Sequence, residues 1–371
     1  MNNNSVFSAA DIINGAVHQY GNIGYQKKKV ALGDILAKAN NIQAHCRDVV
    51  QDLNGMEFHA NPYIVLDNVG KNLFSDGEEV CLTRWSMGQL LSRYGIPVPY
   101  AARCIARRHS DLLEENVNTW LLEDSSKAVL RLYDAGAIHT VRGIVSEKYS
   151  AFDAPEIVSS LMQNHELMTD FAPRNWFVTP ERMQIRLVQN EQFMDEEDLY
   201  LGIIAESSDV GMMSVNVRLF VYKQICTNGL VIPFAGITYR QIHMGQSAEG
   251  FSDDVSSVLR ALPDFRKAAT EVIRASKGNT KLWFDPEDEV SAAAFAKTHG
   301  FLLGVVKAAV AILKDGKYGK PNRWAFINAL TDAAQQLNVD ARNDTERAAG
   351  RLLIETKHEP ADTSFDSNSA A

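Results

Sequence analysis

The chain has 371 residues, of which 46% are hydrophobic and 22% charged, and its formal net charge at pH 7 is −9. This length suits two or three domains, and the composition is typical of a globular protein rather than a disordered or fibrous one. The acidic balance excludes a surface that is basic throughout, but it leaves room for a local basic groove.

The four cysteines are scattered along the chain, and no pair has the spacing of a zinc site or of a disulfide framework. The N-terminus is polar and lacks the features of a signal peptide. No apolar run approaches the ~18 residues that a membrane span requires. We therefore expect a reduced, cytoplasmic protein with no metal, no cofactor and no membrane partner.

Residues 1–125 are predicted to be a mainly helical N-terminal region. Apolar residues between Val30 and Leu53 fit a helical stripe, and the spacing of Ser86 and Gln89 matches a capping box that opens a further helix. The next helix carries three arginines that share one side: Arg103, Arg107 and Arg108. The simplest interpretation of this side is a solvated helix face.

Residues 126–250 are predicted to form the core of the fold, a mostly antiparallel sheet of about five or six strands. The clearest strand is 214–222, where aliphatic residues alternate with polar, aromatic and cationic ones. Its aliphatic positions are Val215, Val217, Leu219 and Val221. Strand candidates at 129–133 and 138–145 flank a short loop with Gly136, which predicts a β-hairpin.

Residues 251–357 are predicted to be a helical C-terminal region. One helix is expected to begin at Asp285-Pro286 and to continue through Lys314, and another to begin at Asn322. The tail 358–371 is polar and rich in Ser and Asp, and we expect it to be disordered. The predicted fold class is therefore α+β, with a central sheet between helical N-terminal and C-terminal parts.

Each of five strand candidates carries one arginine near its middle: Arg131, Arg142, Arg186, Arg218 and Arg240. Where the register is readable, the arginine lies opposite an aliphatic face, and Tyr133 and Tyr222 share the arginine side. If the strands form one sheet, this side combines guanidinium and aromatic groups, which bind phosphates and stack on bases. The alternative is that the arginines pair with carboxylates on neighbouring helices or occupy a solvated face.

A second cationic segment precedes the helix that is expected at Asn322. It contains Lys317, Lys320 and Arg323 next to two glycines, and a helix N-terminus is a natural anion site. These residues form a possible phosphate loop, although the segment lacks the Gly-Lys-Ser/Thr order of a nucleotide-binding loop. The alternative is an ordinary connection between helices.

A short motif of unknown role, Cys226-Thr227-Asn228-Gly229, follows the clearest strand, and His243 lies downstream. A Cys/His/Asn set can supply a nucleophile and its base, which would make the protein an enzyme. The alternative is a structural cysteine at the end of a buried strand.

Several stretches resemble a family of phage, prophage and plasmid proteins that is known only as a domain of unknown function. They are residues 90–97 leading into 116–120, residues 142–149, residues 225–230 with His243, and residues 324–332. The resemblance covers about residues 85–355, and it departs from the family pattern at Thr331-Asp332, where a Thr-Glu-aromatic run is expected. It implies a mobile-element setting, in which genes for replication, recombination and counter-defence cluster, and it implies no activity.

These observations predict a mobile-element protein that binds single-stranded DNA or RNA, with strand annealing in recombination or replication as its role and a homo-oligomer as its assembly. The five strand arginines would contact phosphates, and the two tyrosines would stack on bases. One alternative is an enzyme that acts on a phosphorylated or nucleic-acid substrate through His243. Another is a protein that binds a host factor, which predicts internally paired arginines and an apolar patch exposed elsewhere.

Overall fold

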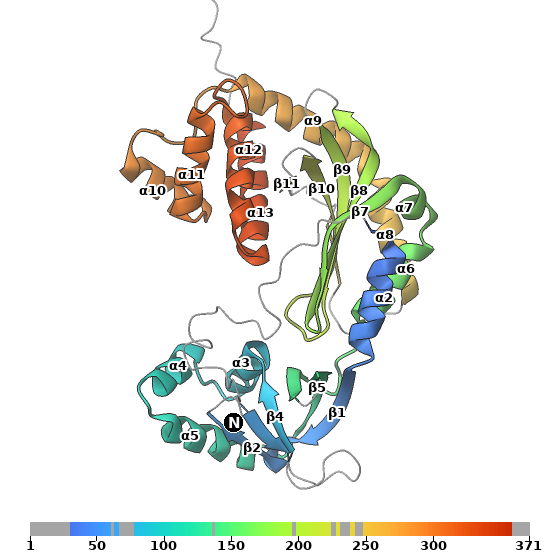
Figure 1. Cartoon of the computed structure of the whole chain (residues 1–371), viewed down its shortest axis with the longest axis vertical. Coiled ribbons are helices and arrows are strands. Elements are labelled where there is room, and N and C mark those ends of the chain that lie inside the picture. Colours follow the sequence, from blue (N-terminus) through green and yellow to red (C-terminus); the bar gives the residue numbers. More distant parts are fainter. Residues whose placement is uncertain are drawn as a thin grey trace, which may run out of the picture.

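The computed structural model describes residues 30–60, 63–66, 78–135, 138–194, 198–223, 228–230, 238–241 and 248–357. In this part of the chain the protein forms two lobes, each with its own sheet and its own hydrophobic core (Figure 1). The mixed α and β content, the mostly antiparallel strands and the helices at both ends confirm the predicted fold class. The prediction placed the strands in one central sheet, whereas the described strands form two.

The lower lobe comprises residues 46–145, and its strands follow the order β1-β5-β6-β4-β3-β2. They are β1 (Cys46–Asp52), β2 (Met56–His59), β3 (Tyr63–Leu66), β4 (Glu78–Leu82), β5 (Lys127–Ala135) and β6 (Ile138–Val145). β5 and β6 form the predicted hairpin, and β4 joins β6 in parallel. Between β4 and β5 the chain forms α3 (Arg84–Arg93), α4 (Val98–Ala106) and α5 (Ser110–Glu123), which pack on this sheet.

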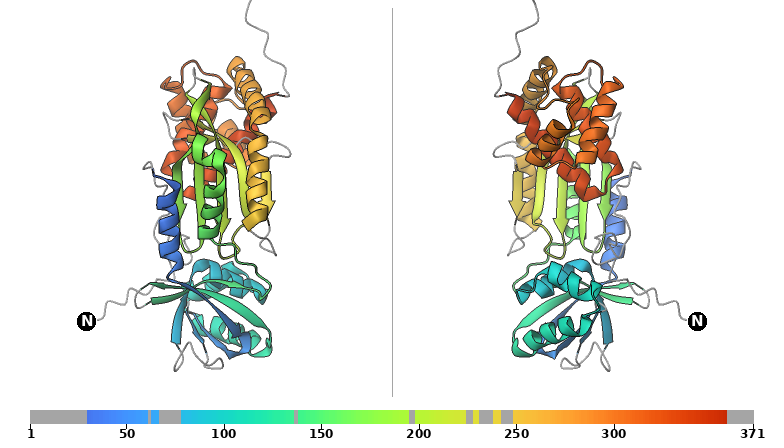
Figure 2. Two further views of the ribbon diagram at one scale, coloured as in Figure 1. Left: turned by 90° about the vertical axis from the view of Figure 1, so that its right-hand side faces the viewer. Right: turned by 90° about the vertical axis from the view of Figure 1, so that its left-hand side faces the viewer.

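The upper lobe contains the second sheet, in the order β11-β10-β9-β8-β7, with β12 also paired to β10. Its strands are β7 (Phe171–Val178), β8 (Arg182–Met194), β9 (Leu199–Ser208), β10 (Val215–Lys223), β11 (Asn228–Leu230) and β12 (Thr238–Gln241). The aliphatic side of β10 lies in the main core, which confirms the predicted alternation. That side faces α2 (Leu32–Gln43), α6 (Ala154–Gln163) and α8 (Ala248–Arg260), as Figure 2 shows.

The remaining helices complete the upper lobe. They are α7 (His165–Asp170), α9 (Leu262–Gly278), α10 (Glu289–His299), α11 (Leu303–Lys314), α12 (Arg323–Ala333) and α13 (Val339–Lys357). α13 lies against the polar side of the sheet. No helix in the described part of the chain has the length and apolar character that crossing a membrane requires.

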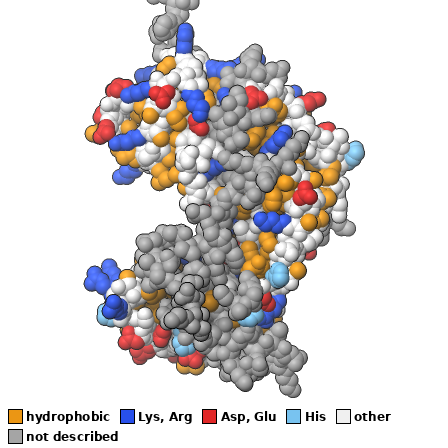
Figure 3. Space-filling model, in the orientation of Figure 1, with side chains coloured by type: hydrophobic (Ala, Val, Ile, Leu, Met, Phe, Trp, Pro, Cys, Tyr) orange, Lys and Arg blue, Asp and Glu red, His pale blue; other side chains and the backbone are white. Residues whose placement is uncertain are grey.

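The lower lobe is an insertion into the upper lobe. Helix α2 belongs to the upper core, the chain leaves it to form β1, and it returns from β6 to α6. The predicted helical stripe through Leu53 is therefore wrong, because the helix ends at Gln43 and Val49 lies in β1. The predicted boundary near residue 126 falls between β1 and β5, which pair within one sheet. Figure 3 shows the surface hollowed between the two lobes.

Candidate anion-binding surface

The arginines of the predicted strands do not share one exposed face. Arg131 and Arg142 lie in the lower sheet, whereas Arg186 and Arg218 lie in the upper sheet. Exposure is 2% for Arg131 and 0% for Arg142 and Arg186. Arg240 is in β12, and its side chain is outside the described part of the structure. The expectation of a single exposed arginine track is therefore wrong.

The upper-sheet arginines hold structural partners. Arg186 donates to Glu346 Oε2 at 2.6 Å and to Asn343 Oδ1 at 2.7 Å, both on α13. Arg218 pairs with Glu206 on the adjacent strand β9. Burial favours the neutral form of Glu346, but Arg186 and a second nearby guanidinium outweigh it and hold the pKa of Glu346 below its ordinary value. Arg186 therefore fits the alternative considered from the sequence, in which a strand arginine pairs with a carboxylate on a neighbouring helix.

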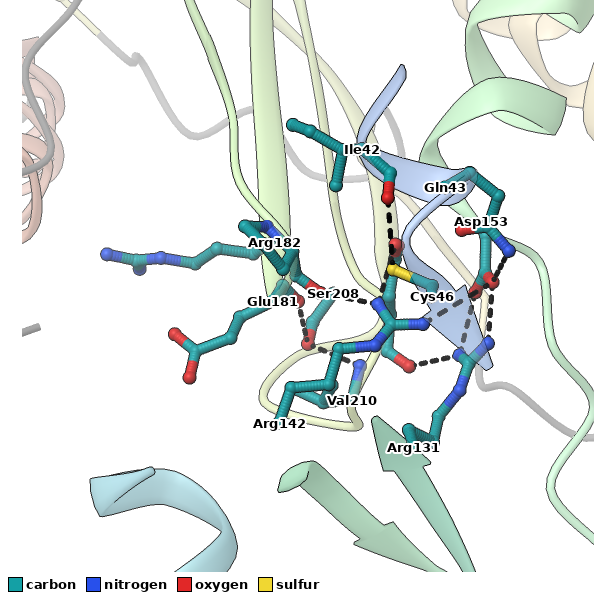
Figure 4. A network of polar contacts seen from close by, with 12 residues as sticks. Ile42, Gln43, Cys46, Arg131, Arg142, Asp153, Glu181, Arg182, Ser208 and Val210 are labelled. Atoms are coloured by element: carbon teal, nitrogen blue, oxygen red, sulfur yellow. Dashed lines mark hydrogen bonds and ion pairs between the residues drawn. The ribbon is translucent and has the colours of Figure 1, made fainter. Parts of the chain in front are cut away.

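The lower-sheet arginines enter a buried network at the junction of the lobes (Figure 4). Arg131 pairs with Asp153 at 2.6 Å, and Arg142 lies 3.4 Å from Asp209.

The predicted stacking residues differ from each other: Tyr133 is half-buried, and Tyr222 is 4% exposed with a pKa raised by burial. Tyr222 is therefore placed for packing rather than for stacking on a base.

The possible phosphate loop is largely engaged in contacts between helices. Lys317 Nζ lies 2.6 Å from Asp332 Oδ2. Arg323 is buried, donates to the carbonyl of Lys281 at 2.7 Å and lies over the ring of Trp283. Lys320 is exposed. The segment thus fits the alternative of an ordinary connection, because two of its three predicted cations are used to hold the helices together.

The Cys-Thr-Asn-Gly motif is described only in part. Asn228 and Gly229 begin β11 and lie opposite Lys223 and Tyr222 of β10. Cys226, Thr227 and His243 lie outside the described residues. A catalytic role of His243 therefore stays a prediction.

A groove of about 440 Å³ lies between α3 and α4 in the lower lobe. Its floor is apolar and built largely of small side chains, so the two helices leave open space between them. The lining residues are Arg84, Met87, Gly88, Leu91, Val98, Pro99, Ala101, Ala102, Arg103 and Ala106. Such a surface accepts apolar or planar groups, while the two arginines can contact their charged ends.

The start of α3 decides where Arg84 lies. The N-cap is Thr83, whose side chain accepts a hydrogen bond from the backbone N–H of Ser86, so the predicted cap at Ser86 is wrong. Ser86 is buried and donates to the carbonyl of Val141 at 2.7 Å, because this turn packs directly on β6. The helix therefore begins at Arg84, which presents its side chain beside the groove.

Two exposed arginines line this groove, Arg84 and Arg103, and two more, Arg107 and Arg108, follow directly after the end of α4. We call these four residues the arginine surface. Among the described residues, none of the four has an ion pair, a hydrogen bond from its side chain or a ring contact. Figure 3 shows Lys and Arg side chains gathered at the tip of the lower lobe, at the turn after α4.

The placement of these arginines has opposing effects on stability. Arg84 is in the first turn of α3, where the helix dipole disfavours a cation by about 0.3–1 kcal/mol. Arg103 and Arg107 are four residues apart and repel each other by about 0.2–0.5 kcal/mol, but they lie at the C-terminal end of α4, where the dipole favours cations. Arg108 has a φ of 60°, in the left-handed region where glycine is favoured after a helix. Arg84 and Arg108 are therefore the two whose positions are unfavourable for folding.

Part of this surface was visible in the sequence. The spacing of Arg103, Arg107 and Arg108 put them on one side of a helix, but a solvated face was the simplest interpretation. A stronger signal is that neither α3 nor α4 contains an Asp or Glu that could pair with its arginines. Arg84 and the groove become apparent only when α3 and α4 are brought together in the fold.

Comparison of the chain with protein-family models, with curated proteins and with solved structures finds no match. The arginine surface is therefore interpreted from its geometry and charge. An exposed group of uncompensated cations beside an apolar groove is suited to bind an anion that also carries apolar or planar groups.

Proposed function

We propose that the protein binds single-stranded nucleic acid through the arginine surface and the groove between α3 and α4. The observation that carries this proposal is the uncompensated charge of four exposed arginines on one small surface. Arg103 and Arg107 repel each other in the free protein, and an anionic ligand would remove this repulsion.

The chemistry of the surface favours a phosphate backbone with unpaired bases. Guanidinium groups form bidentate, charge-assisted hydrogen bonds with phosphate oxygens. The apolar floor between Arg84 and Arg103 offers a place for a base or sugar, which a duplex keeps stacked inside its helix. The net charge of −9 confines attraction for phosphate to this local surface and repels nucleic acid elsewhere.

A binding assay with paired variants tests the proposal. We expect Arg103→Gln/Arg107→Gln to weaken binding of a fluorescent single-stranded oligonucleotide, measured by anisotropy, by about 10- to 100-fold, since each of the two lost contacts contributes about 0.5–1.5 kcal/mol at an exposed site. The matched control is Arg274→Gln/Arg351→Gln, which removes the same charge from two exposed arginines on α9 and α13 and should bind as the wild type does.

Two results would count against the proposal. The first is equal weakening by both double variants, which would make the effect one of net charge. The second is binding of a duplex of the same sequence as tightly as the single strand, because the groove would then have no role. The variant Ala102→Leu, which fills the groove without changing charge, should weaken binding of the single strand.

A second candidate is a partner protein that presents an acidic amphipathic segment. Two observations favour it: none of the residues lining the groove is aromatic, and four of the five strand arginines are paired within the protein. A helix with apolar anchors and flanking carboxylates fits a groove of this kind. In that case an acidic helical peptide, and not the oligonucleotide, would bind and would be lost in Arg103→Gln/Arg107→Gln.

The more specific parts of the predicted function stay predictions. Strand annealing, assembly into an oligomer, the phage or plasmid setting, and the choice between DNA and RNA each require their own measurement. Strand annealing follows only if the wild-type protein binds single strands in the assay above and accelerates the pairing of complementary ones.

A further inference from the structure

The two lobes meet where the turn after β9, residues 209–213, enters the lower lobe. The carbonyl of Val210 accepts hydrogen bonds from Trp85 Nε1 at 2.9 Å and from Gln89 Nε2 at 3.1 Å, both on α3. Gln89 also accepts from the backbone N–H of Ile144 on β6 at 2.8 Å. A Cβ atom on Gly143 would lie 2.7 Å from Val210 Cβ, so the turn packs directly on the backbone of β6.

Asp209 places a carboxyl group at the centre of this junction, which we call the joint. It is 2% exposed, and its Oδ2 lies 3.4 Å from Arg142 Nη1. Its carbonyl accepts a hydrogen bond from Arg131, which also pairs with Asp153 and with Asp48. Figure 4 shows the side chains of Arg131 and Arg142 near Asp153 and Cys46 at this junction.

The side chain of Asp209 has only one charged contact among the described residues. Arg131 donates to both oxygens of Asp153, at 2.7 and 2.6 Å, and to the half-exposed Asp48, so its guanidinium is held by other carboxylates. Asp209 is left with Arg142 at 3.4 Å, and its Oδ1 has no hydrogen-bond partner in the described part of the chain. An ionised Asp209 would therefore be a buried carboxylate with little compensation. Burial and the carboxylate of Asp153 raise the pKa of Asp209 to about 8, against the opposing effect of the two arginines.

Other titratable groups at the joint do not supply a compensating positive charge. Cys46 on β1 has a pKa raised by burial to about 11, and burial also raises the pKa of Tyr149. The backbone carbonyl of Glu181 accepts a hydrogen bond from the backbone N–H of Asp209 at 2.9 Å. Burial raises the pKa of the Glu181 side chain. Ionisation of Asp209 would thus place a second buried carboxylate near Asp153, with Arg142 as the only guanidinium within 4 Å of its carboxyl oxygens in the described part of the chain.

We propose that Asp209 is a proton-operated latch between the two lobes. In its neutral form the carboxyl group lets the turn stay in the joint, and Val210 holds α3 through Trp85 and Gln89. In its ionised form the carboxylate favours withdrawal of the turn into water, which releases α3 from the upper lobe. Because α3 also lines the groove, the latch sets the position of the groove relative to the upper lobe.

The latch has a defined pH window. The closed joint holds the proton of Asp209 up to a pH of about 8, whereas the open joint loses it near the ordinary value of about 4. The closed joint therefore has its full stability below pH ~4. The equilibrium constant for opening then increases about tenfold per pH unit until pH ~8. Asp209→Asn, which cannot ionise, should remove this dependence.

Hydrogen exchange of the full-length protein without nucleic acid tests the latch. Opening breaks the hydrogen bond from the indole N–H of Trp85 to the carbonyl of Val210 and exposes the buried amide of Val210 to water. Comparing wild type with Asp209→Asn at equal pH cancels the intrinsic pH dependence of exchange. We expect the ratio of the two rates to rise about tenfold per pH unit between pH 5 and 8, while the amides of β8 show a ratio near one.

Three results would overturn the latch. One is a ratio that does not change with pH, and another is an equal rise in the amides of β8, which would indicate global unfolding. The third comes from Gly143→Ala, whose Cβ displaces Val210 whatever the pH. This variant should speed exchange of 209–212 at every pH, and unchanged exchange there would show that the turn is not held on β6.

Discussion

Buried arginines in this protein act as structural groups. Arg186 is fully buried between β8 and α13, and its partner Glu346 is also 0% exposed. A guanidinium in such a place is stable only with a carboxylate, because an unpaired buried charge is costly. The aliphatic residues on either side of Arg186 lie in the main core, as the alternation predicted. What the alternation did not show is that α13 covers the polar side as well.

We expect Arg186→Met to lower the free energy of unfolding by about 3–5 kcal/mol, since it leaves the carboxylate of Glu346 without one of its two cations. Urea unfolding at pH 7 measures the change. The control Arg274→Met, at an exposed position of α9, should change stability by less than about 0.5 kcal/mol. Equal effects of the two substitutions would mean that the ion pair between β8 and α13 does not form.

Element boundaries depend on single residues whose effect a periodic pattern does not show. One helix was predicted from Asp285 through Lys314, but the structure contains α10 and α11. Gly300 ends α10 with a φ of 75°, and the chain turns before α11 begins. The apolar periodicity continues across this break because both helices bury a side in the same core.

Gly300→Ala is expected to destabilise the protein by about 1 kcal/mol, because alanine is strained in the left-handed conformation. The matched change Gly304→Ala should stabilise it by about 0.4–1 kcal/mol, since Gly304 lies in α11 and a Cβ there would meet no atom within 4 Å. Thermal unfolding compares the two. Opposite signs support the assigned helix boundary, and a stabilising Gly300→Ala contradicts it.

On the scale of the whole molecule, local patterns identified elements better than partners. The strand of Val215 and the hairpin of β5 and β6 follow from short-range rules of alternation and turn chemistry. Which strands share a sheet depends on contacts between distant segments, such as β1 with β5. The insertion of the lower lobe was therefore not predictable from these patterns.

For the candidate site, too, the sequence identified residues better than their partners. The sequence directed attention to the arginines, and burial separates two groups of them. Those in strands meet carboxylates from distant segments, whereas the four of the arginine surface meet none in the described part of the chain. Sequence spacing identified the strand arginines and three of the arginine surface, but not Arg84, and only the folded chain distinguishes a paired arginine from an available one.

The salt dependence of oligonucleotide binding is the most direct test of the arginine surface. A protein that neutralises phosphates of a single strand shows a slope of about −0.7 per phosphate in a plot of log K against log salt concentration. With four arginines engaged, the wild type should give a slope of about −3, and Arg103→Gln/Arg107→Gln about half of that. A slope near zero, or the same slope for both proteins, would contradict nucleic-acid binding by this surface.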